Sequence, residues 1–136
     1  MKRFLWLLIG ALSLMIWACG DDDSPTQTDT TAPAAITTLA IIGPVDSTCS
    51  LGWVAPGDDL HSGTAESYDI RYATDSIRLL LWNNATVSPN PPTPGQSGAL
   101  HYHTVHDLVP DSVYFFAIKT TDDAGNVSDI SNVVKE

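Results

Sequence analysis

Three histidines in the second half of the chain have a spacing that could serve metal binding. His101 and His103 are two residues apart, and His106 follows three residues later. In an extended strand, residues i and i+2 point to the same face, so both imidazoles could reach one transition metal. His103 also shares the phase of the apolar residue Val105. A histidine cluster that is satisfied within the fold or solvated on the surface is therefore the favoured interpretation over a metal site.

The nucleophilic residues form no pattern typical of an enzyme. The G-x-S-x-G turn of the α/β-hydrolases is absent, and the nearest match, 95–98, lies in a proline-rich stretch. Cys49 alternates in phase with Leu51 and Trp53, so it should face the core as a small apolar residue. A buried thiol without a cationic neighbour is inert. The sequence therefore predicts a non-catalytic protein without a cofactor.

The second cysteine, Cys19, belongs to a different pattern at the N-terminus. Lys2 and Arg3 precede about fourteen mostly apolar residues, which are too few for a membrane span of roughly 20 residues. The block Ile16-Trp17-Ala18-Cys19 resembles the lipobox of bacterial lipoproteins, from which only Trp17 departs. The resemblance implies a signal peptide over residues 1–18 and a lipid anchor on Cys19. An ordinary secretory signal is the alternative.

Residues 19–32 should form a disordered tether. They are rich in Asp, Ser, Thr and Pro and offer nothing that could pack a core. Under the sorting rule of enteric lipoproteins, Gly20 after the lipidated cysteine implies the outer membrane. The expected location is thus the bacterial cell envelope, with its periplasmic or surface face left open.

The charge of the chain excludes one class of partner. The net charge is −10, with 16 acidic residues against six basic ones. Two of the basic residues, Lys2 and Arg3, fall in the predicted signal, so the processed chain is more negative still. Nucleic-acid binding requires clustered Lys and Arg and is therefore not expected.

The remaining chain reads as short strands. Residues 48–53 and 68–72 alternate large apolar with small or polar side chains, and 113–121 is apolar enough on both faces to be a central strand. Further strands are expected at 36–42, 79–82, 101–105 and 127–134. Prolines and glycines forbid regular structure over residues 89–98. About seven strands and no sustained helical period predict an all-β, two-sheet sandwich.

Several motifs make the prediction of the fold more specific. An L-x-P-x-x-x-Y pattern resembles the tyrosine corner of fibronectin type III domains, and a strand tryptophan, a Y-x-I-x-Y run and the D-D-A-G-N-V-S ending match the core positions and last turn of that family. The residues that carry this signature are Trp53, Tyr68, Ile70, Tyr72, Leu108, Pro110 and Tyr114. The likeness covers residues 33–136 and implies an immunoglobulin-like sandwich with His103 turned toward the core.

The resemblance also implies a cluster of acidic loops. In that fold the loops after the second and sixth strands lie at the same pole, where the first strand also starts. Their hard oxygens suit Ca²⁺, and the candidate ligands are Asp58, Asp59, Asp122, Asp123 and Asn126. The favoured alternative is that these residues only cap their own turns.

Two classes of function fit these features. The favoured one is a lipid-anchored, non-catalytic interaction or spacer module whose protein partner is not named by the sequence. The alternative is a carbohydrate- or calcium-dependent adhesive module that uses Trp82, Tyr102 and the loop acids, or a subunit of a larger surface assembly. The oligomeric state is left open.

Overall fold

The computed structural model describes residues 28–43, 46–76 and 79–136. The predicted signal peptide 1–18, Gly20 and the predicted lipid attachment site Cys19 lie outside the described residues. Within the described ranges, no helix combines the length and apolar character that crossing a bilayer demands.

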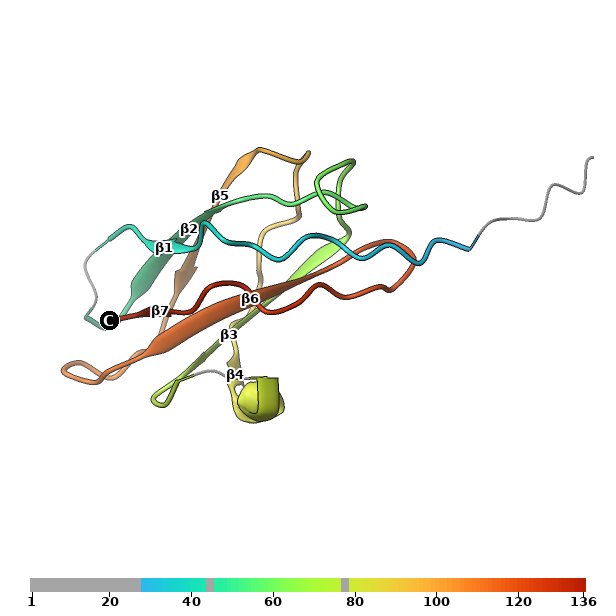
Figure 1. Cartoon of the computed structure of the whole chain (residues 1–136). Coiled ribbons are helices and arrows are strands. Elements are labelled where there is room, and N and C mark those ends of the chain that lie inside the picture. Colours follow the sequence, from blue (N-terminus) through green and yellow to red (C-terminus); the bar gives the residue numbers. More distant parts are fainter. Residues whose placement is uncertain (1–27, 44–45, 77–78) are drawn as a thin grey trace, which may run out of the picture.

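Seven strands form two antiparallel sheets (Figure 1). The three-stranded sheet has the order β1-β2-β5, and the four-stranded sheet has the order β4-β3-β6-β7. The strands are β1 (Ala40–Ile41), β2 (Cys49–Val54), β3 (Ser67–Ala73), β4 (Thr86–Val87), β5 (Leu100–Val105), β6 (Phe115–Thr121) and β7 (Val134–Lys135). The two-sheet sandwich predicted from the alternating pattern is confirmed.

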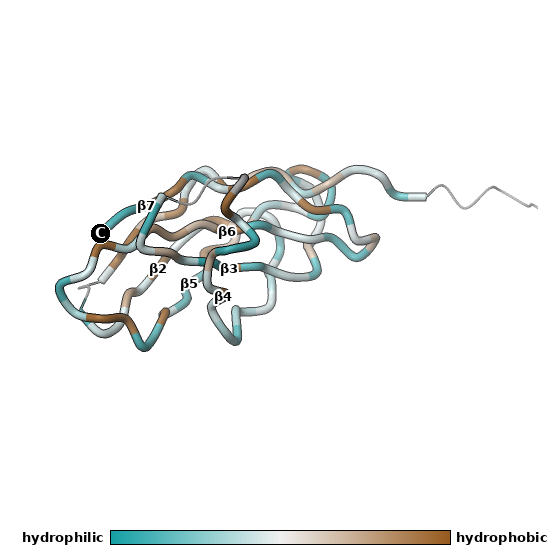
Figure 2. The backbone as a smooth tube through the Cα atoms, turned by 90° about the horizontal axis from the view of Figure 1, so that it is seen from below, coloured by the Kyte–Doolittle hydropathy of each residue, from teal (hydrophilic) through white to brown (hydrophobic). Residues whose placement is uncertain are grey.

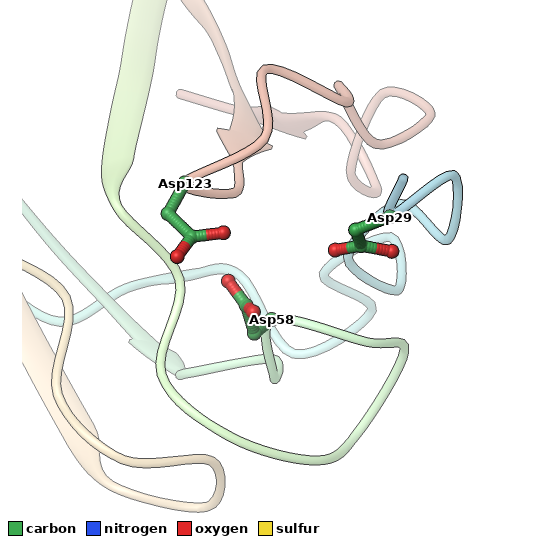
Figure 3. Close-up of side chains that lie close together, drawn as sticks. All are labelled: Asp29, Asp58 and Asp123. Carbon is green, nitrogen blue, oxygen red and sulfur yellow. The ribbon is translucent and has the colours of Figure 1, made fainter. Parts of the chain in front are cut away.

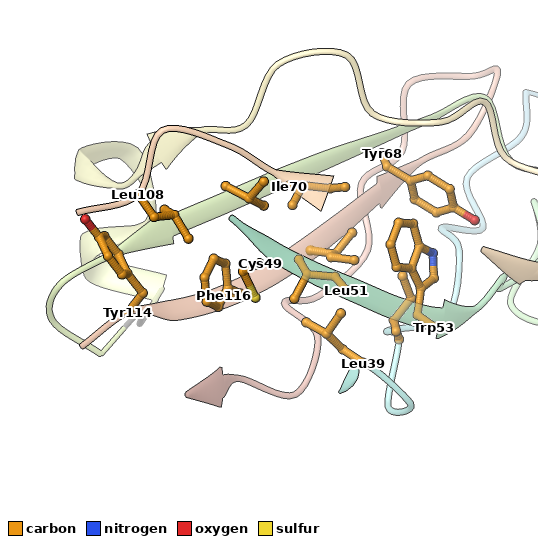
Figure 4. Close-up of a cluster of buried hydrophobic side chains, with 12 residues drawn as sticks. Leu39, Cys49, Leu51, Trp53, Tyr68, Ile70, Leu108, Tyr114 and Phe116 are labelled. Carbon is orange, nitrogen blue, oxygen red and sulfur yellow. The ribbon is translucent and has the colours of Figure 1, made fainter. Parts of the chain in front are cut away.

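The core lies between the two sheets and is filled by their inward residues (Figure 4). Trp53 packs edge-on against Tyr68 with ring centroids 5.2 Å apart. Leu51 and Ile118 are completely buried. Figure 2 shows the hydropathy of the backbone, in which hydrophobic and hydrophilic stretches follow one another along the chain. Cys49 is also fully buried, as predicted.

Three predicted strands differ in the structure. The strand predicted at 36–42 is regular only over β1, because the Asn132 side chain, rather than a neighbouring strand, bonds the N–H and C=O groups of Leu39 at 3.0 and 2.8 Å. Residues 79–84 form a short 3-10 helix, η1 (Leu79–Asn84), instead of a strand, and the edge strand β4 follows it. The cause is Trp82, whose side chain packs with Ala117 against the outer face of the four-stranded sheet. The Arg71 guanidinium fixes this placement by donating to the Trp82 carbonyl at 2.8 Å.

The last predicted strand, 127–134, is regular only at its end. Ser128 and Ser131 lie three residues apart, whereas their partners on β6, Thr120 and Ile118, are two apart. The two serine hydroxyls accept hydrogen bonds from the N–H groups of Thr120 and Ile118, each at 2.9 Å. Side-chain oxygens therefore replace carbonyls where the extra residue breaks the ladder.

The tyrosine corner is present as predicted. Tyr114 is buried, and its hydroxyl accepts a hydrogen bond from the Val109 N–H at 3.1 Å. Leu108 is buried in the core, whereas Pro110 is exposed. Tyr72 is partly buried and packs beside Tyr114 with ring centroids 6.0 Å apart. The corner thus ties the chain before β6 to the core.

Replacing Tyr114 by Phe should isolate the contribution of that hydrogen bond. The ring keeps its packing, but the Val109 N–H loses its acceptor, so the free energy of unfolding should fall by about 1 kcal/mol. Urea denaturation followed by tryptophan fluorescence measures the change. Tyr102→Phe, which removes a hydroxyl from an exposed side chain, should change stability by less than about 0.5 kcal/mol. Equal losses in both variants would contradict a specific role for the corner.

Candidate functional site

The loops after β2 and β6 meet at one end of the sandwich, here called the acidic pole (residues 55–66 and 122–127). Asp58 from the first loop and Asp123 from the second point toward one another (Figure 3). Asp29 joins them, so that three carboxylates each place an oxygen within 4.8 Å of the others. The expectation that these loops share a pole is confirmed. Asp29 is an addition to the predicted set, because it lies in the segment that the sequence predicts as a tether.

The N-terminal segment reaches the acidic pole through main-chain hydrogen bonds. The Ala34 N–H donates to the Leu60 carbonyl at 3.0 Å, and the Leu60 N–H donates to the Ala32 carbonyl at 3.2 Å. Asn126 donates its side-chain N–H to the Asp29 carbonyl at 3.3 Å. Residues 29–32 therefore lie against the sandwich, and the chain enters the domain at this pole.

Local turn chemistry positions Asp58. The Asp58 N–H donates to the Ser62 carbonyl at 2.6 Å, and the Ser62 N–H donates to the Asp59 carbonyl at 2.9 Å. Gly57 is required here because a Cβ at this position would collide with the backbone of Ser62. This tight turn presents the carboxyl groups of Asp58 and Asp59 at the end of the molecule.

Asp122 and Asn126 have a different role from that of the cluster. The Asp122 carboxylate accepts hydrogen bonds from the Asn126 main-chain N–H at 2.7 Å and side-chain N–H at 2.8 Å. Desolvation by itself would raise the pKa of Asp122, but these bonds and those from the N–H groups of Ala124 and Gly125 lower it overall. Both residues are thus engaged in closing their own turn, as the alternative interpretation stated.

The clustered carboxyl groups disfavour one another's ionisation. Desolvation first, and then the negative charge of Asp123, raises the pKa of Asp58 above its usual range. Desolvation and the neighbouring Asp29 likewise raise the pKa of Asp59. The one ion pair in the described part of the chain joins Arg71 and Asp69 on β3, so no described cation pairs with the cluster. One oxygen of Asp58 is buried without a hydrogen-bond partner among the described residues.

The histidines do not converge on one point. The ring of His101 stacks on Trp53 at 6.1 Å, and its Nε2 accepts a hydrogen bond from the Gly95 N–H at 2.9 Å. The Nε2 of His103 lies 2.8 Å from the Ser88 hydroxyl. Burial, and then the nearby His106, lower the pKa of His103. His101 and His103 thus each have their own partner within the fold, whereas His106 is exposed.

Two other candidate residues are buried, Trp82 against the outer face of the four-stranded sheet and Cys49 in the core. Trp82 is only 5% exposed, and Arg71 and Lys119 cover its ring at 5.0 and 5.2 Å from the centroid. The alternative in which Trp82 stacks on a sugar is therefore wrong for this residue, because its ring is already covered. Burial, with a smaller contribution from Glu136, raises the pKa of the Cys49 thiol to about 11. Cys49 stays protonated and unreactive at neutral pH.

A groove that sequence reasoning missed runs beside β5. Its volume is about 470 Å³, and Tyr102, which is 59% exposed, lies at its edge. The residues that line it are Tyr72, Pro89, Asn90, Pro92, Tyr102, His103, Thr104, His106 and Asp107. Aromatic faces, prolines and hydrogen-bonding groups are thus combined along one side of the sandwich.

Three- and four-stranded antiparallel sheets packed face to face, with a tyrosine corner before the sixth strand, define an immunoglobulin-like β-sandwich. Within that class, the domain has the fibronectin type III fold. The fibronectin type III domain of human fibronectin type III domain containing protein 3 superposes with a TM-score of 0.54 at 16% identity, covering 81% of this chain and 89% of that one. The chicken CNTN1 FN1–FN3 domains give 0.51 at 24% identity, covering 76% of this chain and 32% of that one.

The sequence comparisons add one relative. A stretch of 106 residues, 78% of the chain, is 31% identical to Chitinase A1 from Niallia circulans. The match spans 12% of that protein, so the chain corresponds to a small part of its length. No protein-family model matches the chain.

Neutralising Asp123 should stabilise the domain at neutral pH. Because the folded-state pKa values of Asp58 and Asp59 are raised, the native state holds protons more tightly than the unfolded chain. This contribution to stability is fully present below the unfolded pKa of 3.8 and is lost as pH rises through the folded values. Asp123→Asn removes one repelling charge and should raise Tm by about 1–3 °C at pH 7.

The gain should shrink as pH falls from 7 toward 4, because the neighbouring carboxyl groups then become neutral. Scanning calorimetry across this range provides the measurement. Asp46→Asn is the matched control, since it removes one exposed negative charge from the loop between β1 and β2 at the opposite pole. An equal gain in both variants would indicate a general effect of net charge and contradict local repulsion.

Calcium binding at the acidic pole stays a prediction from the sequence. A bound Ca²⁺ would offset the repulsion among Asp29, Asp58 and Asp123, so 1 mM Ca²⁺ should raise Tm by mass action. The Asp58→Asn variant should lose most of this rise. Calorimetric titration that gives no heat, together with an unchanged Tm, would dismiss the ion site.

Proposed function

We propose that this protein is a lipid-anchored, non-catalytic module of the bacterial cell envelope, attached to the outer membrane through Cys19. It serves as a protein-interaction or spacer domain. The observation that carries the anchor is the lipobox-like block Ile16-Trp17-Ala18-Cys19, and the pairing of residues 32–34 with Leu60 sets the orientation, because the chain enters the sandwich at the acidic pole. A lipid on Cys19 would therefore hold this pole nearest the bilayer. The opposite pole and the sheet edges would face outward.

The chemistry of the described residues supports a module that binds rather than reacts. Cys49 is buried with a raised pKa, and His101 and His103 each have a partner within the fold. The fibronectin type III fold and the match to 12% of Chitinase A1 are in keeping with an accessory domain of the kind found beside other functional units. The proposal assigns this chain no chitinase activity.

The second candidate function is adhesion that depends on carbohydrate or calcium. Its support is the exposed Tyr102 on the groove beside β5 and the carboxylate cluster, whereas Trp82 no longer contributes. A glycan array probed with the protein, with and without Ca²⁺, separates this candidate from the first. Binding of a defined glycan that Tyr102→Ala abolishes would favour adhesion.

Lipid attachment is tested by exchanging the two cysteines separately. In a bacterial host fed an alkyne fatty acid, the unmodified protein and Cys49→Ala should incorporate the label and partition into the detergent phase of Triton X-114. Cys19→Ala should incorporate no label and move to the aqueous phase, because the thioether acceptor is gone. Cys49 is the matched control because it is the other cysteine of the chain. Labelling of Cys19→Ala, or an unlabelled parent protein, would refute the anchor.

A further inference from the structure

Strand β5 is the one long edge strand among the described residues. The outer strands of the two sheets are β1, β5, β4 and β7, and all except β5 contain two residues. β5 contains six, from Leu100 to Val105, and pairs on one side only, with β2. It therefore presents a row of main-chain groups on its other side.

The hydrogen-bond pattern identifies which groups of β5 point outward. The Ile42 N–H donates to the Ser50 carbonyl at 2.9 Å, so the main-chain groups of Ser50 face β1. Ser50 lies opposite Thr104 in the antiparallel ladder. At such a pair both residues turn their main-chain groups away from each other, and the pattern repeats every second residue. The N–H and C=O groups of Leu100, Tyr102 and Thr104 thus face away from β2.

The groove beside β5 lies on this free edge. It contacts the three consecutive residues Tyr102, His103 and Thr104. Successive side chains of a strand point to opposite faces of the sheet, so only a groove along the strand edge can touch all three. The main-chain groups of Tyr102 and Thr104 are therefore directed into it.

The opposite wall of the groove cannot complete the sheet. Pro89 and Pro92 belong to the segment between β4 and β5 and line the groove. Proline has no N–H, so this segment cannot supply the regular donors that a neighbouring strand needs. The fold thus holds a proline-rich wall beside β5 and leaves the strand edge open.

The strand itself also lacks the residues that usually guard an edge against pairing, and the groove separates it from the proline-rich wall. Natural sheets guard exposed edges with charged side chains, prolines or bulges. β5, with the sequence LHYHTV, contains no Lys, Arg, Asp, Glu or Pro, and its six residues pair with β2 without a bulge. A long, uncharged and unguarded edge suits the addition of a strand.

We propose that the β5 edge binds an extended peptide segment of another protein, which adds antiparallel to β5 and places every second side chain in the groove. This deepens the interaction-module function proposed above and rests on it. Asp107 ends the groove beyond the C-terminus of β5, where the N-terminal end of an antiparallel peptide would lie. The groove contains no Lys or Arg, so the preferred peptide carries a positive charge at that end.

A second copy of this chain is the less suitable occupant. Each copy carries a net charge of −10, so edge-to-edge pairing would bring two strongly negative molecules together. A basic partner segment gains from the same charge. The partner is therefore defined as an extended, alternating, basic-ended peptide.

The test uses the full ¹⁵N-labelled chain in detergent micelles and the synthetic peptide amide Lys-Thr-Val-Thr-Val-Thr-Val. Amide hydrogen exchange of Leu100, Tyr102 and Thr104 should be fast in the free protein and at least tenfold slower with peptide, because each of these outward N–H groups would donate to a carbonyl of the added strand. A peptide with Glu in place of Lys should bind several-fold more weakly. Unchanged exchange of Tyr102 and Thr104 at millimolar peptide would overturn the proposal.

Protein variants test the same edge. Thr104→Pro removes an outward N–H and no main-chain bond to β2, and should weaken binding at least tenfold. It also removes the 3.2 Å hydrogen bond between the hydroxyls of Thr104 and Ser50. Lys135→Pro, at an outer strand of the other sheet, is the control and should leave binding unchanged. If Thr104→Pro fails to fold, two N-methylated peptides test strand addition with the unmodified protein. The N–H groups of alternate peptide residues point to opposite edges of the added strand. Methylation along the edge that faces β5 should abolish binding, and methylation along the other edge should not.

Three further outcomes would contradict the binding of an extended peptide at the β5 edge. Loss of binding with both methylated peptides, or with neither, would overturn strand addition. Protection that appears on raising protein concentration without peptide would assign the edge to a second copy. If chito-oligosaccharide shifts the amide signals of the groove residues without slowing their hydrogen exchange, the groove would be assigned to a glycan. These results leave the acyl-label experiment on Cys19 unaffected, so failure of this inference and failure of the anchoring proposal are distinguishable.

Discussion

The burial of the inward faces of β2, β3 and β6 against one another is the constraint on which the rest of the structure depends. Leu51, Ile70, Phe116 and Ile118 are completely buried there, and burying each such side chain contributes about 1.5–3 kcal/mol. Because strand side chains alternate, fixing these residues inward also fixes their neighbours outward. The ends of the strands then determine where the loops meet. Neither the acidic pole nor the β5 edge exists until this packing has set the two sheets face to face.

The sequence predicts the sheets well where this constraint acts directly. The strands predicted from the alternating residues 48–53 and 68–72 are present as β2 and β3, and the tyrosine corner forms at Tyr114. The prediction is wrong at 79–82, because a short apolar run does not distinguish a strand from a helical turn. There the decisive contact is Trp82 on Ala117, between residues distant in the sequence. The C-terminal strand is shorter than predicted because serine hydroxyls, not carbonyls, satisfy β6.

The candidate sites also combine features that the sequence predicts with features that it does not. The family resemblance predicts that Asp58 and Asp123 meet, since loop positions follow from topology. The place of Asp29 in the carboxylate cluster is not predicted, because its segment has the composition of a linker. Its one local signal is an Asx turn, in which the Asp29 carboxylate accepts the Thr31 N–H at 2.9 Å shortly before Pro33. The groove beside β5 has no sequence signal, because an open edge is a property of pairing rather than of residue type.

The net charge explains how an unguarded strand edge can persist. Most proteins protect edges locally with a lysine or a proline, since an open ladder pairs with any extended chain. Here β5 itself contains no lysine or proline, but 16 acidic residues against six basic ones repel other copies of the same molecule. Repulsion between whole molecules excludes only negatively charged partners. A lysine or proline on the edge strand would instead block pairing with every strand. Concentrating carboxylates at the acidic pole, away from β5, therefore disfavours self-association and leaves the edge available to a strand of opposite charge.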